Sequence, residues 1–265
     1  MTVEQEKALI ATIDRLPKLS PEQEKALIKV CIQGQVLPLS ELNIGQPFYR
    51  PPVIEITGMP KTFKTSFLKT YALFCAKKGI PVKVIPEPVA PFGRDQSPTA
   101  YNLVLAQRAA DLLLTEQLSE GNGTALTLID RGIYNEIPFL EVYADEEEID
   151  HEDAEIASRY FTRFFGGFID AVVICKASPQ VSLSRENLRA ANPDGRIMNI
   201  QTLGRLRSKF DDLPNRIAAL RNETLLRNTP ILIAELDSEQ PATLYKGNMM
   251  RTIGSLTKIC TSVIY

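Results

Sequence analysis

The segment from Gly58 to Ser66 has the residue types and spacing of a loop that binds nucleotide phosphates. Its sequence, GMPKTFKTS, follows the apolar run VIEIT and opens a stretch with helical spacing. Backbone amides at the start of such a helix surround bound phosphate groups. We expect Lys64 to neutralise the β- and γ-phosphates of ATP and the Thr65 hydroxyl to bind Mg²⁺. The residues expected to surround the nucleotide are Gly58, Met59, Pro60, Lys61, Thr62, Phe63, Lys64, Thr65 and Ser66.

Phe63 departs from the pattern of this loop, which is G-x-x-x-x-G-K-S/T. It stands where the pattern has its second glycine, a position that suits a residue without a side chain. We expect a phenylalanine there to strain the loop or to crowd the nucleotide. The alternative for the whole segment is an ordinary strand-to-helix turn with an accidental Gly and Lys-Thr.

Two charged residues, Asp130 and Arg131, follow the apolar run LTLI. A carboxylate directly after a buried strand can complete the shell of Mg²⁺, although a turn aspartate that caps the next helix is the alternative. A guanidinium group has the shape to contact transferring phosphate oxygens, and the alternative here is a plain surface arginine. We therefore place Asp130 as a second Mg²⁺ ligand and Arg131 as a catalytic residue.

Glu87 stands between Pro86 and Pro88, directly after a short apolar run. The two prolines give it a rigid setting at the edge of the sheet where ligands of open α/β sheets bind. There the carboxylate could accept a proton from an attacking hydroxyl group. The alternative is a loop carboxylate with no chemical task.

Three arginines, Arg185, Arg189 and Arg196, lie in and around the segment RENLRAANPDGR. The first two are four residues apart and would share one helix face. An arginine-bearing lid over the phosphates is the functional interpretation, with Arg185 and Arg189 catalytic and Arg196 in contact with the nucleotide. A solvated helix face is the alternative.

Apolar runs rich in Val, Ile and Leu alternate with stretches of helical spacing from residue 52 onward. This alternation is typical of an α/β fold with a parallel sheet covered on both faces. The expected strands are 53–57, 82–85, 125–129, 171–175 and 231–234. The expected helices are 64–78, 99–119, an acidic one near 146–165, 179–190, 199–226 and 242–263.

The first 50 residues are predicted to form a separate helical hairpin and linker, and residues 51–265 the nucleotide-binding domain. The heptapeptide EQEKALI occurs at 4–10 and again at 22–28, each time after a capping box. One pair of short helices cannot bury its apolar faces alone. We expect the hairpin to pack on the main domain or on a partner, and a homodimer is one such arrangement.

The composition indicates an ordinary globular protein. Lys and Arg number 30 against 32 Asp and Glu, and no basic stripe with interleaved aromatic residues suggests nucleic-acid binding. The four cysteines are far apart and are expected to be buried free thiols. No apolar run suits a signal peptide or a membrane span, so we expect a cytoplasmic location and no membrane partner.

Five segments taken together resemble the thymidylate kinase and deoxynucleoside kinase group of P-loop kinases. They are GMPKTFKTS, IPEPV, SPTAYNLVLAQRAADLL, LTLIDRG and AVVICKASPQVSLSRENLR. The resemblance implies a three-layer P-loop NTPase fold with a five-stranded parallel sheet, ATP and Mg²⁺ as cofactors, and a lid. It also implies that Glu87 is the catalytic base. Arg131 then corresponds to the arginine of the acidic residue–arginine pair that this group carries. The further residues expected to contact a nucleoside or nucleotide acceptor are Arg94, Gln107 and Arg108.

Gly132 departs from this group, whose members carry a hydroxyl or aromatic residue after the acidic-Arg pair. Two functions compete: a kinase that moves the γ-phosphoryl group of ATP to a small acceptor, and a P-loop ATPase or nucleotide-sensing module without an acceptor. The lack of an N-K-x-D element disfavours a GTPase. Phe63 alone suggests a degenerate binding protein that has lost turnover.

Overall fold

The computed structural model describes residues 51–88, 98–118, 125–187, 197–222 and 231–262. These residues belong to one compact unit, Pro51–Tyr265, which is distinct from Met1–Arg50. The expected N-terminal helical hairpin therefore lies outside the described residues. Of the cysteines in the described part, Cys75 and Cys175 are buried free thiols, as expected. None of the described helices has the length and apolar composition needed to cross a bilayer.

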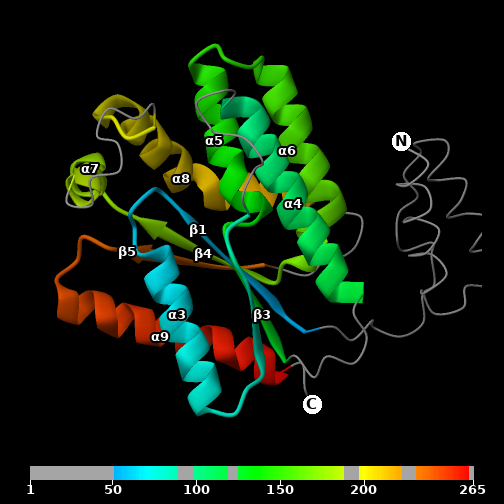
Figure 1. Ribbon diagram of the computed structural model, residues 1–265, viewed down its shortest axis with the longest axis vertical. Coiled ribbons are helices and arrows are strands. Elements are labelled where there is room, and N and C mark those ends of the chain that lie inside the picture. The colour runs from blue at the N-terminus through cyan, green and yellow to red at the C-terminus, as the bar shows by residue number, and fades with distance from the viewer. Residues whose placement is uncertain (1–50, 89–97, 119–124, 188–196, 223–230, 263–265) are drawn as a thin grey trace, which may run out of the picture. The chain divides into compact units, whose positions relative to one another are not determined.

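Five parallel strands form one sheet in the order β2-β3-β1-β4-β5 (Figure 1). Every pair of neighbours in this order is parallel, which confirms the predicted sheet. The strand β1 lies at the centre and is buried along its whole length. The strands are β1 Val53–Gly58, β2 Val82–Ile85, β3 Leu126–Asp130, β4 Ala171–Lys176 and β5 Leu232–Asp237.

Helices cover both faces of this sheet and give three layers (Figure 1). Side chains alternate along β1, so Ile54 and Ile56 pack in one core with α3 and α9, while Val53 packs in the other. That second core is shared with α4, α5, α6 and α8. The helices are α3 Lys64–Lys77, α4 Pro98–Leu118, α5 Ile133–Asp145, α6 His151–Phe165, α7 Pro179–Asn187, α8 Ile200–Arg221 and α9 Ala242–Ser262, with a 3-10 turn η2 at Gly166–Phe168.

The acidic helix expected near 146–165 is α6, which begins at His151, but the sequence did not predict the helix α5 that precedes it at residues 133–145. All side chains of α5 from Ile133 to Leu140 are buried, including Asn135 and Glu136, so this part of the helix has no polar face that a sequence pattern could reveal. It also contains Pro138, which interrupts the hydrogen-bond ladder and usually indicates a helix end. Tertiary packing therefore maintains a helix that local preferences do not indicate.

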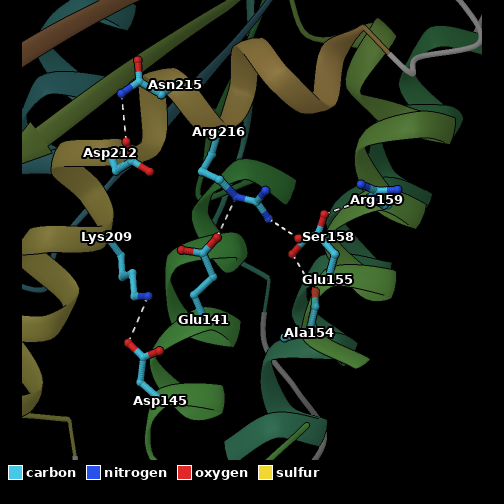
Figure 2. A network of polar contacts seen from close by, with 10 residues as sticks. All are labelled: Glu141, Asp145, Ala154, Glu155, Ser158, Arg159, Lys209, Asp212, Asn215 and Arg216. Carbon is cyan, nitrogen blue, oxygen red and sulfur yellow. Dashed lines mark hydrogen bonds and ion pairs between the residues drawn. The ribbon is translucent and has the colours of Figure 1, made fainter. Parts of the chain in front are cut away.

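Ion pairs join α5, α6 and α8 (Figure 2). Arg216 of α8 donates to Glu141 of α5 at 2.8 Å and also to Glu155 of α6. Lys209 of α8 lies 3.0 Å from Asp145 at the end of α5. Each of these basic groups is paired with a carboxylate. The pairs of Arg216 and Lys209 thus link the three helices.

Candidate active site

The P-loop joins β1 to α3 and begins at Gly58. This residue has φ 138°, and a Cβ there would lie 2.0 Å from the carbonyl oxygen of Cys175, so only glycine fits. The amide of Met59 donates to the same carbonyl at 3.3 Å, which holds the loop against β4. The Thr62 hydroxyl donates to the Met59 carbonyl at 2.8 Å and closes the turn. The predicted strand, loop and helix are thus in place.

Phe63 adopts the left-handed backbone conformation that glycine provides in the loop pattern. Its φ is 64° and its ψ is 21°, directly before α3, so the expectation of a strained loop is confirmed in the backbone. The ring is 42% exposed and lies 4.2 Å from the guanidinium carbon of Arg185. The ring of Tyr245 is 6.2 Å away. The side chain at the unusual position therefore stacks with residues of α7 and α9.

Lys64 is buried, and its ammonium group reaches back over the loop. The Nζ atom donates to the carbonyl oxygens of Gly58 at 2.8 Å and of Met59 at 2.6 Å. Burial, together with the nearby positive charge of Arg131, lowers the pKa of Lys64 to about 7. Because loop carbonyls hold the ammonium group, it lies inside the turn where the sequence pattern places the phosphates.

The helix α7 contacts the P-loop through three side chains. Ser182 donates to the carbonyl of Pro60 at 3.0 Å, and Arg185 donates to the carbonyl of Lys61 at 3.0 Å. Glu186 forms an ion pair with the Lys61 ammonium group at 2.5 Å. Arg185 is thus joined to the loop, whereas Arg189 and Arg196 lie outside the described residues. Their expected lid role remains a prediction.

Thr65 and Asp130 meet at the carboxyl edge of the sheet. The Thr65 hydroxyl donates to Asp130 Oδ2 at 3.0 Å. The other carboxylate oxygen, Oδ1, is buried and has no hydrogen-bond partner among the described residues. A hydroxyl beside an unsatisfied buried carboxylate oxygen is a donor set that suits Mg²⁺. The alternative role for Asp130, capping the next helix, is not observed, because the N-cap of α5 is Gly132.

Arg131 and Glu87 form an ion pair of 2.6 Å at the same edge. They follow β3 and β2, which are neighbours in the sheet, so the pairing of the strands brings them together. Arg131 has φ 61°, and its Nε is buried without an acceptor in the part of the chain that the structure describes. Its side chain is 19% exposed, so it is not a plain surface arginine. The site therefore has a guanidinium nitrogen available for an anion.

The other predicted acceptor residues within the described part of the chain belong to α4. Gln107 and Arg108 are exposed on α4, and Gln107 donates to Asp111 of the same helix at 2.7 Å. The side of α4 that packs into the core instead carries Asn102, whose amide donates to the Tyr143 hydroxyl at 3.0 Å. Arg94 lies outside the described residues. The proposed contacts of these residues with an acceptor remain predictions.

Two functional candidates were missed from the sequence, Glu55 and Asn135. Glu55 is fully buried in β1, and burial raises its pKa to about 8, although backbone amides of Tyr134, Asn135 and Gly132 act in the opposite direction. Asn135 Oδ1 accepts hydrogen bonds from the Thr57 hydroxyl at 3.0 Å and the Gly58 amide at 3.3 Å. The one available signal was a single glutamate within an otherwise apolar strand sequence.

The sheet order, with a P-loop after the central strand and a carboxylate at the end of its neighbour, defines the P-loop kinase fold. No family model and no curated protein matches the sequence. Three solved structures that match are of deoxyadenosine kinase from M. mycoides. One has bound dCTP, with a TM-score of 0.55, 14% identity, and coverage of 77% of this chain and 99% of that chain.

The second structure has the products dCMP and a flexible dCDP bound, with a TM-score of 0.56 at 14% identity, covering 78% of this chain and 99% of that one. The third has bound dATP, with a TM-score of 0.54 at 14% identity, and covers 77% and 99% respectively. At this level of identity the likeness establishes the fold, and it agrees with the fold expected from the sequence.

Proposed function

We propose that this chain is a P-loop kinase that transfers the γ-phosphoryl group of ATP to a nucleoside, nucleotide or similar small acceptor. The observation that supports this best is the Glu87–Arg131 ion pair beside the P-loop. It provides a carboxylate and a guanidinium group at the edge where Thr65 and Asp130 also meet. A module that only holds nucleotide has no need for this additional acid–base group.

The donor nucleotide is bound, in this proposal, by the loop amides and three cationic side chains. Lys64 leaves its carbonyl partners for the phosphates, which favour the charged ammonium form. Arg131 uses the buried Nε, and Arg185 approaches from α7. Thr65 and Asp130 hold Mg²⁺, which offsets negative charge on the phosphate oxygens.

The acceptor enters at the side of Glu87. The Glu87 side chain is 39% exposed, so a hydroxyl group can reach it from solvent. Its carboxylate then accepts the hydroxyl proton while Arg131 keeps it oriented. The matching solved structures hold dATP, dCTP, dCMP and dCDP, which supports a nucleoside or nucleotide as the acceptor class. Arg94, Gln107 and Arg108 remain proposed acceptor contacts, and Arg189 and Arg196 proposed lid residues.

The alternative is a P-loop ATPase or nucleotide-sensing module. The contacts of α7 with the loop favour it, because Ser182 and Arg185 bind the carbonyls of Pro60 and Lys61. A nucleotide that rearranges the loop would be sensed directly by this helix. The kinase proposal differs in requiring an acceptor for turnover.

An acceptor panel separates the two functions. Purified protein with ATP and Mg²⁺ is assayed for ADP release and phosphorylated product with nucleosides and nucleoside monophosphates. The kinase requires turnover that depends on acceptor and disappears in Lys64→Ala. Lys69→Ala, an exposed lysine of the same helix, is the matched control and should retain activity. Equal ADP release without any acceptor would instead establish the ATPase.

A further inference from the structure

Glu55 places a carboxyl group in the middle of the sheet, facing the start of α5. Its strand neighbours are Ile129 of β3 and Val172 of β4, and it is fully buried. Burial of a carboxyl group is unfavourable unless hydrogen bonds satisfy it. The Asn135 amide donates to Oε1 at 2.8 Å and the Tyr134 amide donates to Oε2 at 3.2 Å. Both carboxyl oxygens of Glu55 therefore accept hydrogen bonds from backbone amides in the first turn of α5.

The Glu55 carboxyl group takes the place of a helix cap that α5 lacks. The N-cap position is Gly132, which has no side chain to accept the free amides of the first turn. Most helices obtain this acceptor from the N-cap residue itself. Here it comes from β1, so the position of the helix start is determined by the central strand of the sheet.

The Glu55 side chain leaves no room for a side chain at position 132. Gly132 has φ −100° and ψ −150°, an extended conformation that does not require glycine. A Cβ at this position would lie 2.4 Å from Oε2 and 2.7 Å from Cδ of Glu55. A side chain at position 132 and the carboxylate of Glu55 cannot occupy this space together.

The first turn of α5 is linked both to the Asp130–Arg131 segment and to the P-loop. Asp130 and Arg131 precede Gly132, and the Arg131 amide is held by the Ile56 carbonyl at 3.0 Å. On the other side, Asn135 accepts hydrogen bonds from Thr57 and from Gly58, the first residue of the P-loop. A shift of the first turn of α5 would therefore move Asp130 and Arg131 and weaken the hydrogen bonds that hold the start of the P-loop.

We propose that Glu55 is a positioning residue: it caps α5 from the central strand, fixes the Asp130–Arg131 turn against the P-loop, and requires glycine at position 132. The catalytic part of this proposal rests on the proposed function, whereas the pairing of Glu55 with Gly132 does not. Misplacement of reacting groups by about 1 Å can lower a rate about 10²-fold. A loss of that order is expected when the cap is removed.

A double-mutant cycle tests the pairing without any assay of activity. Glu55→Ala, Gly132→Ala and the double variant are unfolded in urea, and native-state hydrogen exchange is measured at the Tyr134 and Asn135 amides. Gly132→Ala should be strongly destabilising alone and much less so in the Glu55→Ala background. Glu55→Ala should speed exchange of the two amides at least about tenfold relative to the centre of β1. Equal cost of Gly132→Ala in both backgrounds would overturn the pairing.

Steady-state kinetics then test positioning, with Val53→Ala as the control. Val53 lies two residues before Glu55 on the same face of β1 and is fully buried, so its truncation weakens the core without removing the cap. Glu55→Ala should lower kcat about 10²-fold with little change in KM for ATP. Glu55→Gln keeps one acceptor oxygen and should show an intermediate kcat. Val53→Ala should keep kcat within about threefold at 20 °C, and an equal loss in both variants would refute positioning.

The two proposals can fail separately. If the wild-type protein transfers no phosphoryl group to any acceptor, the proposed function fails, while the urea cycle still decides the pairing. In that case positioning is measured by the Mg²⁺ dependence of ATP affinity, because Asp130 belongs to the turn. Loss of that dependence in Glu55→Ala but not in Val53→Ala supports positioning, and its retention in both contradicts it.

Discussion

Replacement of Phe63 by glycine or alanine tests whether the P-loop holds a side chain in a strained backbone conformation. The left-handed conformation costs an L-residue about 1–2 kcal/mol, a cost that glycine does not have. Glycine loses about 0.5–1 kcal/mol more backbone entropy on folding than alanine. At φ 64° we therefore expect Phe63→Gly to be more stable than Phe63→Ala by about 0.5–1 kcal/mol.

Both variants lose the contacts of the phenylalanine ring. The stack on Arg185, with the guanidinium carbon 4.2 Å from the ring centre, is worth about 0.5–1 kcal/mol at an exposed site. The pair with Tyr245 at 6.2 Å adds about 0.5–1.5 kcal/mol. Phe63→Ala keeps the strain and loses these contacts, so it should be about 1–2.5 kcal/mol less stable than wild type. Phe63→Gly should recover roughly half of this loss.

Leu73, in the helix that follows Phe63, provides the matched control. It is 56% exposed in the interior of α3, where glycine is less favourable than alanine by about 1 kcal/mol. The order of the two substitutions should thus be opposite at positions 63 and 73. Urea unfolding of the four variants measures the free energies of unfolding. If the glycine variant is less stable than the alanine variant at both positions, Phe63 is not in the left-handed region and the strain assigned to this position is wrong.

Three further predictions concern the carboxyl groups of the site. Because burial raises the pKa of Glu55 to about 8 from 4.5, the folded state binds a proton more tightly than the unfolded state, so stability falls as pH rises from 4.5 to 8. At about 1.4 kcal/mol per pH unit, this loss of stability amounts to at most about 5 kcal/mol. The free energy of unfolding of Glu55→Gln, measured across the same pH range, should not show this loss. Asp130→Asn should remove most of the Mg²⁺-dependent increase in ATP affinity, measured by calorimetry with and without Mg²⁺, and an unchanged Mg²⁺ effect would exclude Asp130 as a ligand. Glu87→Gln should lower the transfer rate about 10²-fold and leave ATP affinity unchanged, whereas an unaltered rate would remove Glu87 from the mechanism.

The sheet and the P-loop could be predicted because their signals are local. Each strand is a short run of Val, Ile and Leu, and the expected boundaries differ from the observed ones by no more than three residues. The loop from Gly58 to Thr65 is continuous in sequence, so its spacing alone indicates its geometry. The meeting of Asp130 with Thr65 follows from the pairing of two predicted parallel strands.

The helix α5 and the role of Glu55 could not be predicted because their causes are not local. The part of α5 from Ile133 to Leu140 is buried on all sides and has no polar face, and Pro138 within it resembles a helix end. Glu55 meets the start of α5 only because β1 pairs with β3 in one register, which places it beside Ile129. A lone glutamate in an apolar strand does not show which helix it will cap.

Two departures from the kinase pattern, Phe63 and Gly132, are each in contact with, or leave space for, a residue far away in the sequence. The Phe63 ring stacks on Arg185, which is itself held by Ser238 at 2.9 Å and by the loop. Gly132 leaves the space that the Glu55 carboxylate occupies. Both residues that depart from the pattern thus take part in the packing around the P-loop and the first turn of α5.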